Sequence, residues 1–230
     1  MRFVAFGCSH TWGDGIVPGD TRNQREANGG IGFTLMHHDS PPSKFSWVQH
    51  LSNKFNVPVL NLACSGSSNA YILHKIRNHD WQKDDIGLIL WTFIERDVIF
   101  EDTNIFEHVG PNFGKYNKYS EKYYKIFPKF HNEFMSLMHI EHAYFYLRSK
   151  NISMISRFYD KDITLPLDNF DKKMAEDFQK IALLEVYNLL TNKFKKPQVG
   201  ADGMHCNSLV HELFAQSIEP ELSQFINQIS

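Results

Sequence analysis

The chain has few cysteines, no long apolar run and almost no net charge. Three cysteines, an odd number, argue against the disulfide framework that is typical of small secreted proteins. No uninterrupted apolar run approaches the ~20 residues that a membrane-spanning helix needs, and the apolar stretch at the N-terminus is too short for a signal peptide. We therefore expect a soluble cytoplasmic protein with no membrane partner.

The charge balance excludes a second class of partner. The formal net charge is -2 at pH 7, from 24 basic and 26 acidic residues, and no long basic cluster is present. Surfaces that bind nucleic acid need clustered Lys and Arg to neutralise phosphates, so we expect no nucleic acid as partner. With 42% hydrophobic residues, the chain can bury one substantial core, and we expect residues 1–230 to form a single domain.

Apolar strand-like runs alternate with amphipathic helical patterns along the chain. Apolar strands separated by helices are typical of a parallel sheet that is covered on both faces. We therefore expect a three-layer α/β/α fold, flavodoxin-like, with four or five parallel strands. Strands are predicted at residues 2–7, 57–62, 86–93 and 152–157, and helices at residues 45–55, 69–79, 130–150, 171–193 and 208–229, the last kinked or interrupted near Pro220.

Two connections are long for a fold of this kind. Residues 16–44 show no sustained periodicity, which is typical either of a lid or binding loop or of a surface excursion. His37 and His38 lie in this segment, and adjacent histidines are more often exposed loop residues than metal ligands. We expect residues 16–44 and 104–124 to influence specificity.

A candidate nucleophile lies at one end of the chain, and a candidate base and carboxylate lie at the other. Ser9 ends the first apolar run, in the segment FGCSHTWGDG, and Asp202 and His205 lie in DGMHCN. A serine hydroxyl becomes a strong nucleophile when an imidazole takes its proton and a carboxylate fixes that imidazole. Taken alone, Asp202 and His205 could instead mark a turn and a helix cap.

Gly66 adds a candidate backbone donor. It lies in NLACSGSSN, just after the second predicted strand, while Ser9 follows the first. Ligands of parallel α/β sheets gather at the carboxyl ends of the strands, so the N–H groups of Ser9 and Gly66 can converge there. Two convergent N–H groups are the beginning of an oxyanion hole.

These segments resemble the sequence blocks of the SGNH hydrolase superfamily, also called GDSL lipases and esterases. FGCSHTWG is similar to its nucleophile block, with Cys8 where the family name has Asp; NLACSGSSN is similar to its oxyanion-glycine block, and DGMHCNSLVHELFAQSI to its last block. The order of these three blocks along the chain agrees with their order in the family. The resemblance implies a Ser-His-Asp triad of Ser9, His205 and Asp202, with Ser9 and Gly66 in the oxyanion hole.

One block of the family is missing. Where the family has G-x-N-D after the third strand, whose Asn donates to the oxyanion, this chain has LWTFIERD. Thr92, Arg96 or Asn69 could supply a donor in its place. Loss of one such donor can lower turnover by roughly a hundredfold to a thousandfold. The alternative to an enzyme is therefore a weak or inactive binding or structural module with the same fold.

The implied activity is that of a serine esterase acting on a small-molecule or carbohydrate ester, for example an acetyl ester. It needs no metal and no organic cofactor. His10, Trp12 and Arg96 are candidate substrate-binding residues. Each has a structural alternative: His10 and Trp12 as packing residues, and Arg96 as the partner of Glu95 or Asp97.

The three cysteines each lie beside one of the candidate site segments. We expect Cys8, Cys64 and Cys206 to be small buried residues that pack behind the site. The alternative is a thiol or metal enzyme that uses them with His205. His211, on the last predicted helix, is expected to be structural.

Overall fold

Four parallel strands form the central sheet of the computed structural model, which describes residues 1–16, 42–100, 106–109, 120–203 and 205–229. The strand order is β2-β1-β3-β6. β3 is buried along its whole length, as expected of an inner strand covered on both faces. The strands are β1 (Arg2–Phe6), β2 (Val59–Asn61), β3 (Asp85–Trp91) and β6 (Ser153–Phe158).

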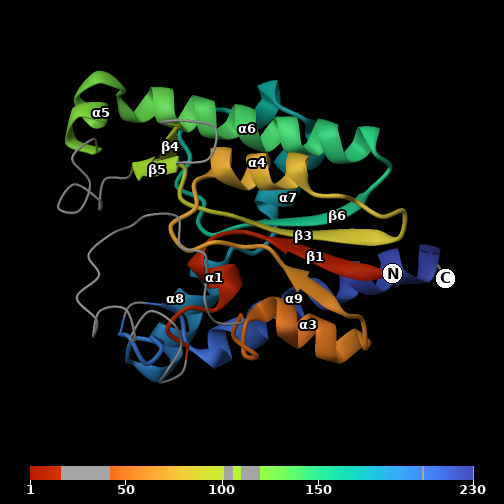
Figure 1. Ribbon diagram of the computed structural model, residues 1–230. Coiled ribbons are helices and arrows are strands. Elements are labelled where there is room, and N and C mark those ends of the chain that lie inside the picture. The colour runs from red at the N-terminus through yellow and green to blue at the C-terminus, as the bar shows by residue number, and fades with distance from the viewer. Residues whose placement is uncertain (17–41, 101–105, 110–119, 204, 230) are drawn as a thin grey trace.

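Two helical layers cover this sheet (Figure 1). One face packs against α3 (Trp47–Phe55), α8 (Leu183–Phe194) and α9 (Ser208–Ile229). The other packs against α4 (Asn69–Asn78), α6 (Lys129–Ser149) and α7 (Lys172–Gln179). The prediction of a flavodoxin-like three-layer α/β/α fold is confirmed, with four strands in the parallel sheet.

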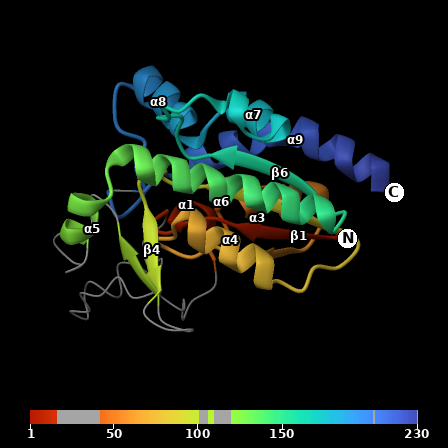
Figure 2. The ribbon, with the colours of Figure 1, turned by 90° about the horizontal axis from the view of Figure 1, so that it is seen from above.

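Alternate side chains of β1 enter the two cores. Phe3 and Ala5 pack with the α3, α8 and α9 layer, whereas Val4 and Phe6 pack with the α4, α6 and α7 layer. This is the period of two that an extended strand imposes. In Figure 2, which is turned by 90°, α4 and α6 lie side by side over the sheet, in agreement with their packing.

Local capping explains where the first helices begin and end. The Ser68 hydroxyl accepts a hydrogen bond from the Tyr71 N–H at 3.2 Å and begins α4. Asn56 ends α3 in the left-handed conformation, at φ 53°. The helices predicted at residues 45–55, 69–79 and 130–150 are therefore confirmed, with ends shifted by one or two residues.

The prediction of one helix over residues 171–193 is wrong. The chain forms two helices there, because Lys180 at the end of α7 has extended backbone angles and the Glu185 carboxylate accepts a hydrogen bond from the Ala182 N–H at 2.6 Å, which begins α8. The Leu184 N–H donates to the Tyr159 carbonyl at 2.9 Å, so a contact with the end of β6 fixes the start of α8.

The last helix has its predicted bounds, but the interruption predicted near Pro220, as an alternative to a kink, is absent. α9 is one continuous helix from Ser208 to Ile229 and contains Pro220, so the helix is not interrupted. Next to the proline, Glu221 accepts from Arg157 Nη2 at 2.8 Å and from Lys180 Nζ at 2.7 Å. These contacts hold α9 against β6 and the end of α7 at the point where the proline removes a backbone hydrogen bond.

Several short elements were not predicted. They are α1 (Ser9–Trp12), α5 (Ser120–Ile126), the 3-10 turn η2 (Leu167–Asn169) and an antiparallel pair of strands, β4 (Asp97–Phe100) and β5 (Phe106–Val109). Residues 17–41, with His37 and His38, and most of residues 104–119 lie outside the described residues.

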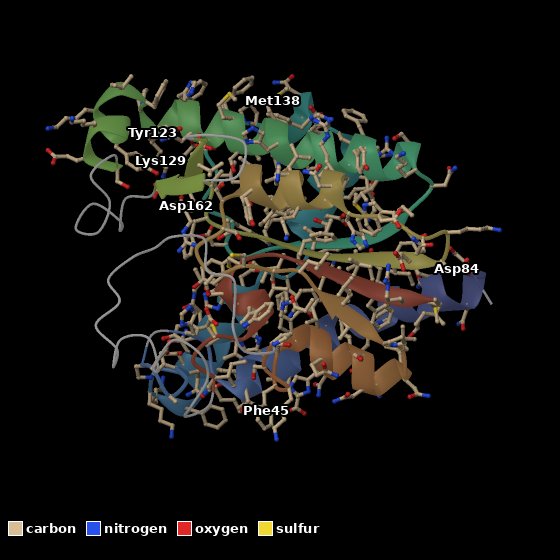
Figure 3. All side chains as sticks on the ribbon, in the orientation of Figure 1. Phe45, Asp84, Tyr123, Lys129, Met138 and Asp162 are labelled. Carbon is tan, nitrogen blue, oxygen red and sulfur yellow. The ribbon has the colours of Figure 1, made fainter. Side chains whose placement is uncertain are left out.

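Polar contacts at the surface join the loop after β6 to the start of α6. Lys129 Nζ lies 3.3 Å from Asp162 and 3.8 Å from Glu95, and Figure 3 labels the first pair. Both partners of this contact are well exposed, so it contributes little to stability. In the part of the chain that the structure describes, no helix is long and apolar enough to cross a bilayer.

Candidate active site

Ser9 lies just past the carboxyl end of β1, where it begins α1. A glycine is needed at position 7 because neighbouring atoms lie very close to its α-carbon. A β-carbon there would lie 2.2 Å from Thr11 Oγ1 and 3.0 Å from the Leu90 carbonyl oxygen. The Ser9 carbonyl accepts from the Gly13 N–H at 2.7 Å. Because the first N–H groups of a helix have no acceptor within that helix, the Ser9 N–H can serve a ligand.

Two hydrogen bonds join Asp202 and His205 on a tight turn before α9. Asp202 Oδ1 accepts from the backbone N–H of His205 at 2.9 Å, and Asp202 Oδ2 lies 2.6 Å from His205 Nδ1. Both side chains are less than a tenth exposed. In the tautomer that has its hydrogen on Nδ1, His205 donates to the carboxylate and its Nε2 remains an acceptor.

The turn with Asp202 packs directly on the loop that follows α1. The Ala201 N–H donates to the Gly15 carbonyl at 2.7 Å. Glycine is required on both sides of this contact: a β-carbon on Gly15 would lie 2.1 Å from Asp202 Oδ2, and one on Gly200 would lie 2.3 Å from the Gly15 carbonyl oxygen. The loop after α1 and the turn before α9, which are far apart in the sequence, therefore meet beyond the carboxyl end of β1.

His10 is the residue of α1 whose side chain contacts His205. The two ring centroids lie 5.1 Å apart. Within the described part of the chain, no hydrogen bond joins the Ser9 hydroxyl to His205. Such bonds are often long in a free enzyme and shorten only with substrate. Burial, aided by His205, His211 and Arg96, lowers the pKa of His10 well below its usual range, so His10 is neutral.

Gly66 lies in a turn after β2, next to the chain segment that leads from β1 into Ser9. The Cys64 N–H donates to the Gly7 carbonyl at 3.1 Å, and the Ser67 N–H donates to the Cys64 carbonyl at 3.2 Å. Gly66 has φ 79°, while Ser65 has negative φ, which is the pattern of a type II turn with glycine in the third position. Among the described residues, nothing lies within 4 Å of where a β-carbon on Gly66 would be.

The buried side chain of Asn69 joins three elements by hydrogen bonds. Its Nδ2 donates to the Thr92 carbonyl at 3.3 Å and to Ser136 Oγ at 2.7 Å, and its Oδ1 accepts from the Thr92 N–H at 2.9 Å. Asn69 begins α4, Thr92 follows β3 and Ser136 lies on α6. Both amide hydrogens are used in these bonds, so in this arrangement Asn69 has none to donate to an oxyanion.

Thr92 keeps a hydrogen to donate. Its Oγ1 accepts from Arg96 Nη1 at 3.2 Å, which leaves the hydroxyl hydrogen for another acceptor. The Arg96 guanidinium also lies 4.4 Å from the centroid of the Phe93 ring, a cation–π contact. Arg96 is thus held by Thr92 and Phe93 near the end of β3.

Trp12 closes the short helix that Ser9 begins. It is partly exposed, and its carbonyl accepts from the Ser43 N–H at 3.0 Å. This contact joins α1 to the segment that leads into α3.

The three cysteines are free and buried. Burial, together with the nearby Cys8, raises the pKa of Cys206 to about 12. A thiol with such a pKa stays protonated at neutral pH and is a poor nucleophile. The described residues contain no cluster of three or more His, Cys, Asp or Glu side chains that could hold a metal ion.

Tyr159 was not among the predicted site residues. It directly follows β6, where its N–H donates to the Trp91 carbonyl at 2.9 Å. Its ring centroid lies 4.5 Å from that of His10 and 4.4 Å from that of Phe93. The signal in the sequence was its position, because it lies two residues past the strand predicted at 152–157 and the carboxyl ends of parallel strands share one edge.

No protein-family model and no curated protein matches the chain. Several solved structures are similar to it, among them three at 11% identity. An acetyl xylan esterase aligns over 96% of this chain and 99% of its own, with a TM-score of 0.49. A protein from Desulfitobacterium hafniense assigned to the G-D-S-L lipolytic family aligns over 94% and 96%, with 0.39. A psychrotrophic esterase from Pseudoalteromonas, inhibited by monoethylphosphonate, aligns over 99% and 100%, with 0.40.

Proposed function

We propose that this protein is a serine hydrolase that cleaves carboxylic esters, with Ser9 as nucleophile, His205 as base and Asp202 as the group that orients His205. One observation carries the proposal: Asp202 and His205 are joined by two hydrogen bonds, and their turn is docked on the loop that follows Ser9. A lone helix cap would need only the bond from Asp202 to the backbone. The 2.6 Å contact with Nδ1 is the one that orients an imidazole for proton transfer.

In the first half of the reaction, Ser9 Oγ attacks the ester carbonyl carbon. Its proton passes to His205 Nε2 as the new C–O bond forms, and the carbonyl oxygen becomes negatively charged. The tetrahedral intermediate then collapses, the bond to the leaving alcohol breaks, and His205 returns the proton to that alcohol. Asp202 stabilises the positive imidazolium throughout and accepts no proton.

In the second half, water replaces the alcohol. His205 Nε2 takes a proton from the water as its oxygen attacks the acyl carbon, and returns that proton to Ser9 Oγ when the acyl–enzyme bond breaks. The products are the free acid and the original enzyme. The pKa of His10 is lowered by its burial, so this second imidazole stays neutral and does not compete for the proton.

The negative oxygen needs donors at the carboxyl edge of the sheet. The backbone N–H groups of Ser9 and Gly66 are our candidates, and the Thr92 hydroxyl is the side-chain candidate, because its oxygen already accepts from Arg96. Asn69 is a weaker candidate than the sequence suggests, since both of its amide hydrogens are engaged.

We propose a small acyl group, for example acetyl on a carbohydrate. Ser9 and His205 are each only 7% exposed, which favours a compact acyl group over a long chain. His10, Trp12 and Arg96 are the proposed substrate-binding residues. Arg96 would hold a polar substituent of the substrate through its guanidinium.

The test is labelling with a fluorophosphonate serine probe followed by peptide mapping, beside hydrolysis of p-nitrophenyl acetate. We expect the adduct on Ser9, and we expect Ser9→Ala to abolish both labelling and hydrolysis. Ser149→Ala is the matched control, because Ser149 is exposed and its hydroxyl only donates to the Tyr146 carbonyl. The proposal would be overturned if the Ser9→Ala variant folds and hydrolyses the ester as fast as the wild type does.

A second candidate is a binding or structural module with the same fold and no catalysis. The engaged amide of Asn69 and the missing hydrogen bond between Ser9 and His205 among the described residues favour it. This candidate predicts a protein that does not react with the probe and is inert toward a panel of short-chain esters. Reaction at Ser9 would exclude it.

A further inference from the structure

A continuous stack of side chains leads from the end of β3 to His205. The Arg96 guanidinium lies over Phe93 at 4.4 Å, Phe93 lies 4.4 Å from Tyr159, Tyr159 lies 4.5 Å from His10, and His10 lies 5.1 Å from His205. Spacings of this size are those of rings in favourable contact. Tyr159 is the middle member of this stack.

Tyr159 is held from several directions. Its ring has His10 and Phe93 as close neighbours. Its backbone is fixed as well, because its N–H donates to Trp91 and its carbonyl accepts from Leu184, both at 2.9 Å. The side chain can therefore move little, and a donor on a rigid side chain costs little entropy to use.

The phenol group is the part of Tyr159 that these contacts leave available. Across the described residues its oxygen has no hydrogen-bond partner, yet it is absent from the fully buried polar atoms that lack one, in contrast to His10 Nδ1. The oxygen is therefore not fully enclosed by the protein. An O–H group in this position can bind a ligand without breaking an existing bond.

The protonation state suits a donor. Burial raises the pKa of Tyr159 above its usual range, and the nearby Cys206, Cys8 and Asp160 raise it further, while Arg96 lowers it. The phenol thus keeps its hydrogen at neutral and mildly alkaline pH. A protonated phenol can donate to a negative oxygen but cannot act as a base there.

The strand register places Tyr159 beside Thr92, one of the candidate oxyanion donors. Trp91 pairs with Phe158, so Thr92 and Tyr159 are the next residues on two adjacent strands. The Tyr159 ring also contacts the ring of His10, which directly follows Ser9 in the sequence. Asn69, in contrast, has both amide hydrogens engaged.

From this arrangement we propose that Tyr159 is a catalytic residue whose phenol O–H donates a hydrogen bond to the substrate oxygen that becomes negative when Ser9 attacks. The inference rests on the proposed esterase function and adds a donor to it. It assigns to the tyrosine that directly follows β6 the stabilisation of the negative oxygen, for which the segment after β3 offers Thr92 and Arg96.

Tyr159→Phe tests this directly, because it keeps the ring contacts and removes one oxygen. We expect kcat for p-nitrophenyl acetate to fall by roughly a hundredfold with KM little changed, as for the loss of one oxyanion donor. The control is Tyr146→Phe, whose hydroxyl only donates to the Arg77 carbonyl on the α4 and α6 side of the sheet. Thermal unfolding confirms that both variants fold.

A second measurement separates donation from a structural role. Fluorinated tyrosine at position 159 keeps the ring but has a lower phenol pKa than the ordinary value of about 10. We expect activity to decline on the alkaline side at a lower pH than in the wild type, because the ionised phenol can no longer donate. A structural ring would leave the pH profile of kcat unchanged.

The outcomes are distinguishable from failure of the proposed function. If the wild type neither labels at Ser9 nor hydrolyses esters, both proposals fall. If the wild type is active through Ser9 but Tyr159→Phe keeps the wild-type kcat, or fluorination leaves the pH profile unmoved, only the assignment of Tyr159 is overturned.

Discussion

Gly15 lies directly against the carboxylate of Asp202, so closely that a β-carbon on Gly15 would come within 2.1 Å of Asp202 Oδ2. The same oxygen lies 2.6 Å from His205 Nδ1. A residue six positions after Ser9 thus limits where the carboxylate from the other end of the chain can lie. The orientation of His205 depends on this contact as well as on Asp202 itself.

Gly15→Ala should therefore reduce activity by displacing Asp202. The added methyl group and the carboxylate oxygen cannot occupy the observed positions together, and loss of the carboxylate from Nδ1 costs a serine hydrolase up to about 10⁴-fold in kcat. We expect a loss of at least tenfold in kcat with KM little changed, measured with p-nitrophenyl acetate.

Gly203→Ala is the matched control for this substitution. Gly203 also has positive φ, 70° against 69° for Gly15, but a β-carbon there would meet none of the described residues within 4 Å. Both variants place an alanine at nearly the same positive φ, but Gly15→Ala alone adds the clash with Asp202. Equal losses of kcat in the two variants would show that strain, and not Asp202, is responsible.

Asn69→Ala should mainly destabilise the fold. The substitution leaves the Thr92 N–H, the Thr92 carbonyl and the Ser136 hydroxyl without their buried partner. Because each unsatisfied buried group costs about 1–3 kcal/mol, we expect the free energy of unfolding to fall by about 3 kcal/mol in a denaturant titration. Asn78→Ala, at the exposed end of α4, is the control. A large loss of kcat at unchanged stability would instead favour Asn69 as an oxyanion donor.

His211→Leu should make the protein less sensitive to acid. Burial, with the nearby His205 and His50, lowers the pKa of His211 from its ordinary 6.5 to about 3. The unfolded chain therefore binds a proton that the folded chain rejects, so stability is complete above pH 6.5 and falls as the pH drops toward 3, by up to ~1.4 kcal/mol per pH unit.

The measurement is the free energy of unfolding of both proteins at pH 8 and pH 5. His211→Leu should gain about 2 kcal/mol relative to the wild type between these two pH values. His142→Leu, a change at an exposed histidine of α6, should show no such gain. The same difference from the wild type at both pH values would contradict the prediction.

Glu221→Gln should destabilise the contact between α9 and β6. Arg157 is almost fully buried and its guanidinium donates to Glu221 at 2.8 Å. Loss of the carboxylate leaves this cation poorly compensated, which we expect to cost about 2–3 kcal/mol in the free energy of unfolding. Glu121→Gln removes the exposed partner of Lys125 and should change nothing measurable. Similar effects of the two changes would show that burial does not strengthen the Arg157 pair.

The predicted strands and most of the predicted helices were recovered because the buried face of an element needs apolar residues, which recur in the sequence at the period of that element. β3 is apolar from Ile86 to Trp91 and is covered on both faces, while α3 has apolar residues on the one face that it buries. The break between α7 and α8 was missed because it depends on the contact of Leu184 with the carbonyl of Tyr159, which comes from a distant strand.

The candidate residues were predictable for a different reason. Ser9, Asp202 and His205 are chemically distinctive and lie in short segments of recognisable type, so they could be found without coordinates. The contact between Asp202 and His205 also follows from their spacing of three residues on a tight turn, but the contacts that surround the candidate residues were not predictable. The engaged amide of Asn69 and the stack around Tyr159 depend on which strand ends lie next to each other and at what register.

The sequence by itself determined the layered α/β architecture and the candidate residues for ester hydrolysis, because periodicity and side-chain chemistry are local properties of a chain. Only the tertiary structure decided that Gly15 lies against Asp202, that Asn69 is engaged and that Tyr159 stacks on His10. These are contacts between segments far apart in the sequence, and they depend on side-chain packing over distances of a few ångströms, which no local pattern encodes.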